Sequence, residues 1–212
     1  MARRGTPKAK IESLFATQIY RAQLPRRDMA LNAALEQTCL AIAAEDRAGQ
    51  RWCKEHGYHG YTSYASLDDL PNRASIFAEL VTHLDGHVRS FAKTLEFDMD
   101  VRRLALDSLW INVLKPGGLH SAHIHPHSVI SGTYYVAVPD AASAIRYEDP
   151  RLPMMMAAPP KRATARRANR TFVTADPAPG SILLWESWLR HDVPANRAKE
   201  LRISISFNYG VR

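Results

Sequence analysis

From Leu104 to the C-terminus, apolar and polar residues alternate with a period of two, in short runs separated by turn residues. This spacing is typical of β-strands that bury one face. It predicts strands near residues 104–114, 121–125, 129–138, 143–148, 171–175, 181–186, 190–193 and 201–210. Residues 149–170 interrupt the pattern with an insertion that has no periodicity, and loops of this length are usually functional lids or disordered segments.

The N-terminal half has helical spacing instead. Asp28 is the predicted N-cap of a first helix that ends before Gly49, and Asn72 is the predicted cap of a second helix. Their apolar positions are Leu31, Leu35, Cys39 and Ile42 in the first helix and Phe77, Leu80, Leu84, Val88, Phe91 and Leu95 in the second. Residues 14–24 are predicted to form a strand and residues 52–71 a loop. Short strands after two helices predict an α+β fold, a β-sandwich or small barrel backed by helices.

With 212 residues and 46% hydrophobic content, the chain is long enough for one full core. We expect a single domain over residues 1–212, with a disordered tail at 1–10, a helical support at 11–103, and a strand core at 104–212 that carries the insertion at 149–170. The sequence has no apolar run long enough to span a bilayer and no signal peptide at its start, so we expect a cytoplasmic protein. Cys39 and Cys53 form no disulfide framework.

The formal charge of +7, from 28 basic and 21 acidic residues, would favour an anionic partner if it were clustered. The clusters are an N-terminal tail and the insertion, where Lys161, Arg162, Arg166, Arg167 and Arg170 crowd together. Because no recognition fold accompanies them, nucleic acid is disfavoured as a partner. We expect a small-molecule or peptide substrate, anionic if the insertion lies beside the site, with no membrane association. The sequence is compatible with a homodimer.

Four of the nine histidines lie in one short segment, residues 118–127. If the segment is extended, His123 and His125 point to the same side and can hold one metal ion between them. Neutral imidazole suits iron, copper, nickel or zinc, whereas calcium and magnesium prefer oxygen ligands. His120 and His127 are expected to face water.

The last predicted strand separates an apolar face from a polar one. Its polar face consists of Arg202, Ser204, Ser206 and Asn208. An arginine that points into a barrel is costly unless it meets an anion, and its planar guanidinium matches a carboxylate. A carboxylic acid ligand is the natural partner of Arg202, and the alternative is an internal salt bridge to one of the 21 acidic residues.

A His-x-His segment, a further histidine about sixty-six residues later and an Arg-x-Ser strand beyond it together resemble the Fe(II)/2-oxoglutarate-dependent oxygenases. The run Ser-Gly-Thr-Tyr-Tyr-Val within residues 128–138, and the run Leu-Leu-Trp-Glu-Ser-Trp-Leu-Arg-His-Asp-Val that ends at Val193, resemble the prolyl-hydroxylase-like branch and bacterial proteins assigned to it. The resemblance covers roughly residues 107–209. It implies a double-stranded β-helix, or jelly-roll, core with N-terminal supporting helices.

The resemblance also implies roles for individual residues. His123 and His191 match the first and the distal iron ligand, and they form the catalytic metal site together with His125, which stands where the family has a carboxylate. Glu148 or Asp149 could supply that carboxylate instead. The residues implied to bind 2-oxoglutarate are Arg202, Ser204 and Tyr135 at its far carboxylate, and Asn112 as a further polar contact.

The activity implied is that of a dioxygenase with Fe(II) and 2-oxoglutarate as cofactors, which hydroxylates its substrate and releases succinate and carbon dioxide. One alternative is a cupin-type metal enzyme with a three-histidine site and no 2-oxoglutarate, although Val129 and Ile130 stand where the first cupin motif has its glutamate. The other alternative is a non-catalytic module that binds acidic partners through the basic insertion. The sequence does not identify the substrate.

Overall fold

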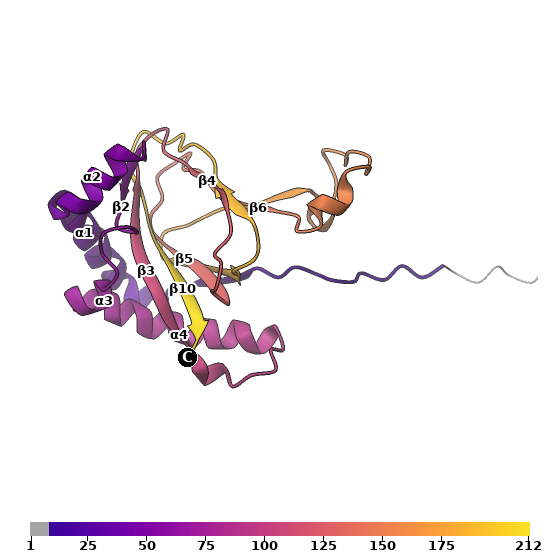
Figure 1. The fold of residues 1–212 in the computed structure, drawn as a ribbon, viewed down its shortest axis with the longest axis horizontal. Helices are drawn as coiled ribbons and strands as arrows, with labels where there is room; N and C mark the ends of the chain where they lie inside the picture. Colours follow the sequence, from indigo (N-terminus) through magenta and orange to yellow (C-terminus); the bar gives the residue numbers. More distant parts are fainter. Residues whose placement is uncertain (1–8) are drawn as a thin grey trace, which may run out of the picture.

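Residues 9–212 are described by the computed structural model, and they form two antiparallel sheets with helices packed against one of them (Figure 1). Within this range, the larger sheet has the strand order β1 (Tyr20–Gln23), β8 (Ser181–Glu186), β5 (Ile130–Ala137), β10 (Arg202–Val211), β3 (Leu104–Leu114) and β2 (Gly60–Thr62). The smaller sheet has the order β4 (His120–His123), β9 (His191–Val193), β6 (Ile145–Glu148) and β7 (Phe172–Ala175).

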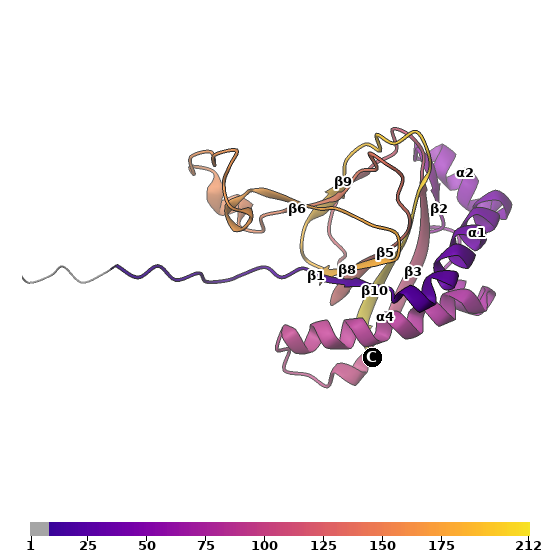
Figure 2. The same ribbon diagram turned by 180° about the vertical axis from the view of Figure 1, so that it is seen from behind.

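The helices lie in the N-terminal half and cover one face of the larger sheet (Figures 1 and 2). They are α1 (Met29–Glu45), α2 (Arg47–Glu55), α3 (Leu70–Arg73) and α4 (Ser75–Thr94), with 3₁₀ turns at Arg26–Asp28, Val101–Arg103, Leu152–Met155 and Arg167–Asn169. The apolar stripes of α1 and α4 meet β3, β5 and β10 in one continuous core. Burial of this apolar surface is the main stabilising contribution to the fold.

Strand β10 lies between β3 and β5, and its two faces differ as the alternation of its residues predicts. Ile203, Ile205, Phe207 and Tyr209 are buried in the core beneath the helices. Arg202, Ser204, Ser206 and Asn208 face the opposite side and line a cavity between the two sheets. A Cβ atom on Gly132 of β5 would overlap the Phe207 ring, so only glycine allows this close approach of strand and side chain.

The predicted strands from residue 104 onward are all present, and the α+β class is confirmed. Their bounds differ by one or two residues in most cases, which is usual for strand ends. The strand predicted at 121–125 instead ends at His123, and the strand predicted at 14–24 is limited to Tyr20–Gln23.

The helix boundaries required three corrections. Gly49 does not follow the first helix but lies inside α2, because Asp46 begins a new helix by accepting a hydrogen bond from the Gly49 N–H. The region predicted as a loop from Trp52 therefore starts as helix and also contains β2. Asn72 lies inside α3, and α4 begins only after Ala74, whose extended conformation separates the two helices.

The insertion at 149–170 projects from the β6–β7 hairpin away from the rest of the fold (Figures 1 and 2). The tail predicted at residues 1–10 lies almost entirely outside the described residues. None of the helices within residues 9–212 has the length and apolarity needed to cross a membrane.

Gly49 in α2 has no room for a side chain, because a hydrogen-bond network lies directly against it. The Asp46 carboxylate accepts hydrogen bonds from the Gly49 N–H at 3.0 Å, from the Tyr61 hydroxyl at 2.9 Å and from Ser66. Burial opposes ionisation of Asp46, but these hydrogen bonds outweigh it and hold its pKa below the usual value. A Cβ atom on Gly49 would overlap both the Asp46 carboxylate and the Ser66 hydroxyl.

We therefore predict opposite effects for two glycine-to-alanine substitutions within helices. Gly86→Ala in α4, where a Cβ meets nothing within 4 Å, should raise the free energy of unfolding by about 0.5–1 kcal/mol because alanine is the better helix former. Gly49→Ala should lower it by about 1–3 kcal/mol because the side chain disrupts the Asp46 network. Urea unfolding of both variants tests this, and stabilisation by Gly49→Ala would contradict the steric argument.

Candidate metal and cofactor site

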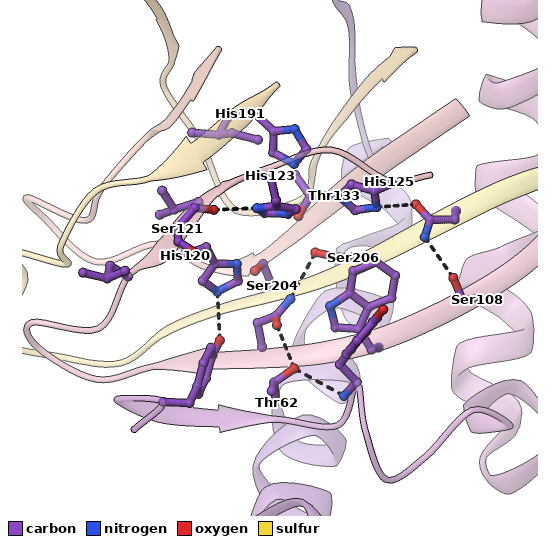
Figure 3. A pocket seen from close by; sticks show the side chains of 18 of the residues that line it. Thr62, Ser108, His120, Ser121, His123, His125, Thr133, His191, Ser204 and Ser206 are labelled. Carbon is purple, nitrogen blue, oxygen red and sulfur yellow. Dashed lines mark hydrogen bonds between the residues drawn. The ribbon is translucent and has the colours of Figure 1, made fainter. Parts of the chain in front are cut away.

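A cavity of about 1150 Å³ lies between the two sheets. All seven side chains singled out in the sequence line it, namely Asn112, His123, His125, Tyr135, His191, Arg202 and Ser204. They come from β3, β4, β5, β9 and β10 and from the segment that follows β4. Folding thus brings residues that are more than ninety positions apart in the sequence to one site (Figure 3).

Three histidines meet at the inner end of this cavity. His123 on β4 and His191 on β9 are opposite each other in the strand register, and their ring centroids are 4.5 Å apart. His125 follows β4, is held by a backbone hydrogen bond to Ser187, and places its ring 5.1 Å from each of the other two. One ring nitrogen of each histidine lies within 4.8 Å of the others, so the three could share one metal ion.

Hydrogen bonds at the other ring nitrogens orient all three histidines. Nδ1 lies 2.6 Å from the Ser121 carbonyl in His123 and 2.7 Å from the Asn208 side-chain oxygen in His125 (Figure 3). In His191 it lies 2.8 Å from the Leu189 carbonyl. Since these partners are acceptors, each Nδ1 carries the proton and each Nε2 keeps its lone pair. The His125 Nε2 is buried without a hydrogen-bond partner, as expected for an atom that binds a ligand.

The site also keeps two of the three histidines neutral. Burial lowers the pKa of His191 to about 3 and that of His125 to about 4, and the neighbouring His123 adds to both effects. Both rings are therefore uncharged at neutral pH. An uncharged imidazole is the form that binds metal ions.

The carboxylates considered as alternative ligands are engaged elsewhere. Glu148 forms an ion pair of 2.7 Å with Arg190, and Asp149 forms one of 2.8 Å with Arg151. Neither residue lines the cavity, and among residues 9–212 the cluster suited to a metal contains only the three histidines. The geometry therefore favours His125 over Glu148 and Asp149.

Arg202 carries a buried charge beyond the histidines. Its side chain is 2% exposed, Nη1 donates to the Ser204 hydroxyl at 3.3 Å, and Nε has no partner. No salt bridge to Arg202 is present in the described part of the chain, so the internal salt bridge considered as an alternative does not form. A buried guanidinium without an anion is strongly unfavourable, and a carboxylate in the cavity would compensate it.

Tyr135 completes the surroundings of this guanidinium. Its ring centroid lies 5.1 Å from the Arg202 Cζ, and its hydroxyl is buried without a hydrogen-bond partner. Burial raises the pKa of Tyr135, so the hydroxyl stays protonated and can donate. Asn112 also lines the cavity, but its amide is already bonded to Thr62 and Ser206, and a contact to a cofactor remains a prediction.

His120 was predicted to face water, and the structure shows instead that it lines the cavity. Its Nε2 lies 2.8 Å from the Tyr58 hydroxyl, and burial lowers its pKa to about 3. A register shift between His120 and His123 turns both residues to the same side, which strict alternation would not allow. His127 is exposed, as predicted.

Asn208 is a second residue whose role the sequence did not reveal. Its side-chain oxygen accepts from His125 and Ser131, while its amide nitrogen donates to Ser108 at 3.0 Å. These three bonds fix the orientation of the amide, and the amide in turn fixes His125. Its inward position on β10 was predicted, but its contact with a residue 83 positions away was not visible in the sequence.

Comparison with known proteins agrees with this arrangement. Residues 108–208 match the model of a family described as "Putative 2OG-Fe(II) oxygenase", where 2OG is 2-oxoglutarate. The match spans just under half of the chain, and this segment is similar to that family, whose description names Fe(II) and 2-oxoglutarate. A search of the curated proteins found no match to the chain.

Several solved structures share the fold at low sequence identity. The epimerase SnoN, in complex with Fe³⁺, α-ketoglutarate and nogalamycin RO, has a TM-score of 0.64 at 14% identity over 92% of this chain and 79% of its own. A prolyl-4-hydroxylase of Pseudomonas putida has a TM-score of 0.60 at 14% identity over 92% and 94%. The collagen prolyl hydroxylase of Paramecium Bursaria Chlorella virus-1 has 0.56 at 10% over 91% and 96%. These likenesses confirm the predicted double-stranded β-helix fold with N-terminal helices.

We predict that a divalent metal ion binds at the three histidines. Co(II) should quench the tryptophan fluorescence, because the Trp185 ring lies 4.7 Å from that of His191. His125→Ala should weaken binding by at least about a hundredfold, since even the loss of a group that only supports a ligand costs about 10–100-fold. The exposed His127→Ala, two positions away, is the matched control and should bind as the wild type. Equal affinity in both variants would remove His125 from the site.

Asn208→Leu should weaken Co(II) binding by about 10–100-fold, because the His125 Nδ1 proton loses its acceptor. Asn112→Leu is the control for a lost polar network in the same cavity, since its amide bonds only to Thr62 and Ser206. It should reduce stability without changing metal affinity. If both substitutions change metal affinity equally, the effect of Asn208 is structural and not directed through His125.

Proposed function

We propose that this protein is an Fe(II)- and 2-oxoglutarate-dependent dioxygenase that hydroxylates its substrate and forms succinate and carbon dioxide. The single observation that carries the proposal is that one cavity contains both a three-histidine cluster and a buried guanidinium without an anion. These are the two features needed to hold a metal ion and a dicarboxylic acid side by side. The match of residues 108–208 to the family model supports the same pair of cofactors.

The histidine cluster fits Fe(II) by its donor atoms. His123, His125 and His191 would each offer an Nε2 lone pair, and three protein ligands leave further positions for other groups. Their Nδ1 hydrogen bonds hold the rings in place before any metal arrives, which lowers the cost of ordering the site.

The polar end of the cavity fits the far carboxylate of 2-oxoglutarate. Arg202 would bind it through its guanidinium, and the Tyr135 hydroxyl would donate to it, so a single carboxylate satisfies two groups that are buried without partners. Ser204 bonds to Arg202 and would support this position. The histidine cluster would then hold one end of a bound 2-oxoglutarate, and Arg202 would hold the other.

The charges of the two ends also favour a dianion. The three imidazoles are neutral ligands, so they leave the charge of a divalent metal ion uncompensated, and Arg202 adds a further positive charge. The two carboxylates of 2-oxoglutarate would offset most of this charge in an environment that screens it poorly. This need is greater here than in a site with a carboxylate ligand.

When bound, Fe(II) and 2-oxoglutarate supply the oxidative chemistry: dioxygen and the 2-oxo acid are consumed, a substrate C–H bond is hydroxylated, and succinate and carbon dioxide are released. The protein orients the reactants and limits access of water. Trp185 and Val193 contribute buried apolar surface to the cavity wall around the histidines.

A cupin-type enzyme would use the same three histidines without 2-oxoglutarate. A cupin-type function would leave Arg202 and Tyr135 buried without partners, so it accounts for fewer features of the cavity. A module that binds acidic partners through the basic insertion would have no use for the histidine cluster, because the insertion does not line the cavity.

Arg202→Met should weaken 2-oxoglutarate binding by about ten- to a hundredfold, because a charge-assisted bond to a buried carboxylate contributes about 1.5–3 kcal/mol. Arg190→Met is the control, since Arg190 is next to His191 in sequence but pairs with Glu148 and does not line the cavity. Anaerobic titration of the Fe(II)-loaded protein, followed by its visible charge-transfer band and by calorimetry, measures the affinity. No 2-oxoglutarate binding by the wild type would favour the cupin alternative.

A further inference from the structure

The outer part of the cavity, between the histidines and solvent, is lined mainly by rings. They come from the region of α2 and β2 and from β3, and they are Trp52, His56, His59, Tyr64 and Trp110. Leu119 and Ile124 also line the cavity and expose 51% and 46% of their surface. This part of the cavity is not needed to hold a metal ion or 2-oxoglutarate.

Two of these rings, Tyr64 and Trp110, extend from the solvent to the histidine cluster. Tyr64 is 64% exposed, and its ring meets that of Trp110 edge to face at a centroid distance of 5.2 Å. Trp110 in turn stacks on His125 at 5.8 Å. Tyr64 and Trp110, which we call the aromatic wall, therefore form one surface that leads from the solvent to a residue of the histidine cluster.

The outer cavity has few charges. Among residues 9–212, Arg202 is the only lysine or arginine that lines the cavity, and Asp107 is the only acidic residue that lines it. The five basic residues of the insertion, which suggested an anionic substrate, do not line it. A charged substrate would therefore lose its hydration with little compensation, because the described residues in this part of the cavity include no lysine or arginine and only one carboxylate, that of Asp107.

We propose that the substrate of this enzyme is a neutral small molecule with an aromatic ring, which binds with that ring against the aromatic wall. The inference rests on the proposed dioxygenase function. Aromatic rings prefer edge-to-face or offset contacts with one another, and such contacts contribute beyond the burial of area alone. A ligand that covers Tyr64 also removes from water an aromatic side chain that is otherwise exposed.

The first test compares three probes that share a naphthalene ring and carry different charges: 2-naphthol, 2-naphthoate and 2-naphthylmethylammonium. Their affinities for the full-length protein, loaded anaerobically with Fe(II) and 2-oxoglutarate, are measured by calorimetry. We expect 2-naphthol to bind at least about tenfold more tightly than either ion. Equal or tighter binding of 2-naphthoate would overturn the assignment of a neutral substrate, as would tighter binding of the ammonium compound.

The second test locates the binding surface. Tyr64→Ala should weaken 2-naphthol binding by about tenfold, and Tyr64→Phe, which keeps the ring, should restore it. Trp188→Ala is the matched control, because Trp188 is 47% exposed but does not line the cavity. Unchanged affinity in Tyr64→Ala, or an equal loss in Trp188→Ala, would overturn the assignment of the aromatic wall.

Direct titrations with Fe(II) and 2-oxoglutarate separate this inference from the proposed function. If the wild type and Tyr64→Ala bind both cofactors equally but the two tests with 2-naphthol do not give the expected differences, the inference alone is overturned. If the wild type binds neither cofactor, the proposed function fails, and the aromatic wall can no longer be assigned to the substrate of an oxygenase.

Discussion

Strand β10 is the element on which the fold and the site both depend, because consecutive residues of a strand point to opposite faces. One face supplies Ile203, Ile205 and Phe207 to the core beneath the helices. The other presents Arg202, Ser204 and Asn208 to the cavity. Packing of the apolar face therefore fixes the position of the polar face, and a shift of one residue in register would exchange the two.

Burial has different effects on the two kinds of basic group in the cavity, histidine and arginine. Burial keeps His125 and His191 neutral, because an imidazole can lose its proton at little cost. Arg202 cannot become neutral in the same way, because a guanidinium remains charged under all ordinary conditions. The same low-polarity surroundings therefore favour neutral, metal-binding histidines and make an anion beside Arg202 strongly favourable.

The proposed cofactor site lies within the matched segment, whereas the proposed substrate region extends beyond it. The three histidines, Tyr135 and Arg202 all lie within residues 108–208, which match the family model. Tyr64 and Trp52 lie outside it and reach the cavity from the region that also supports the larger sheet. Chemistry held by the strand core and selectivity contributed by surrounding segments is a common arrangement among enzymes.

The sequence by itself determined the strands from residue 104 onward and the two faces of β10, because periodicity is a property of the chain alone. The resemblance of its motifs to a known family added seven residues that line the cavity. Tertiary structure decided what depends on contacts between distant segments. The position of His120 required the register shift against β9, the orientation of His125 required Asn208, and the helical state of Gly49 required the Asp46 network. It also decided that Arg202 lacks an acidic partner, since whether a buried charge is paired depends on which side chains the completed fold brings near it.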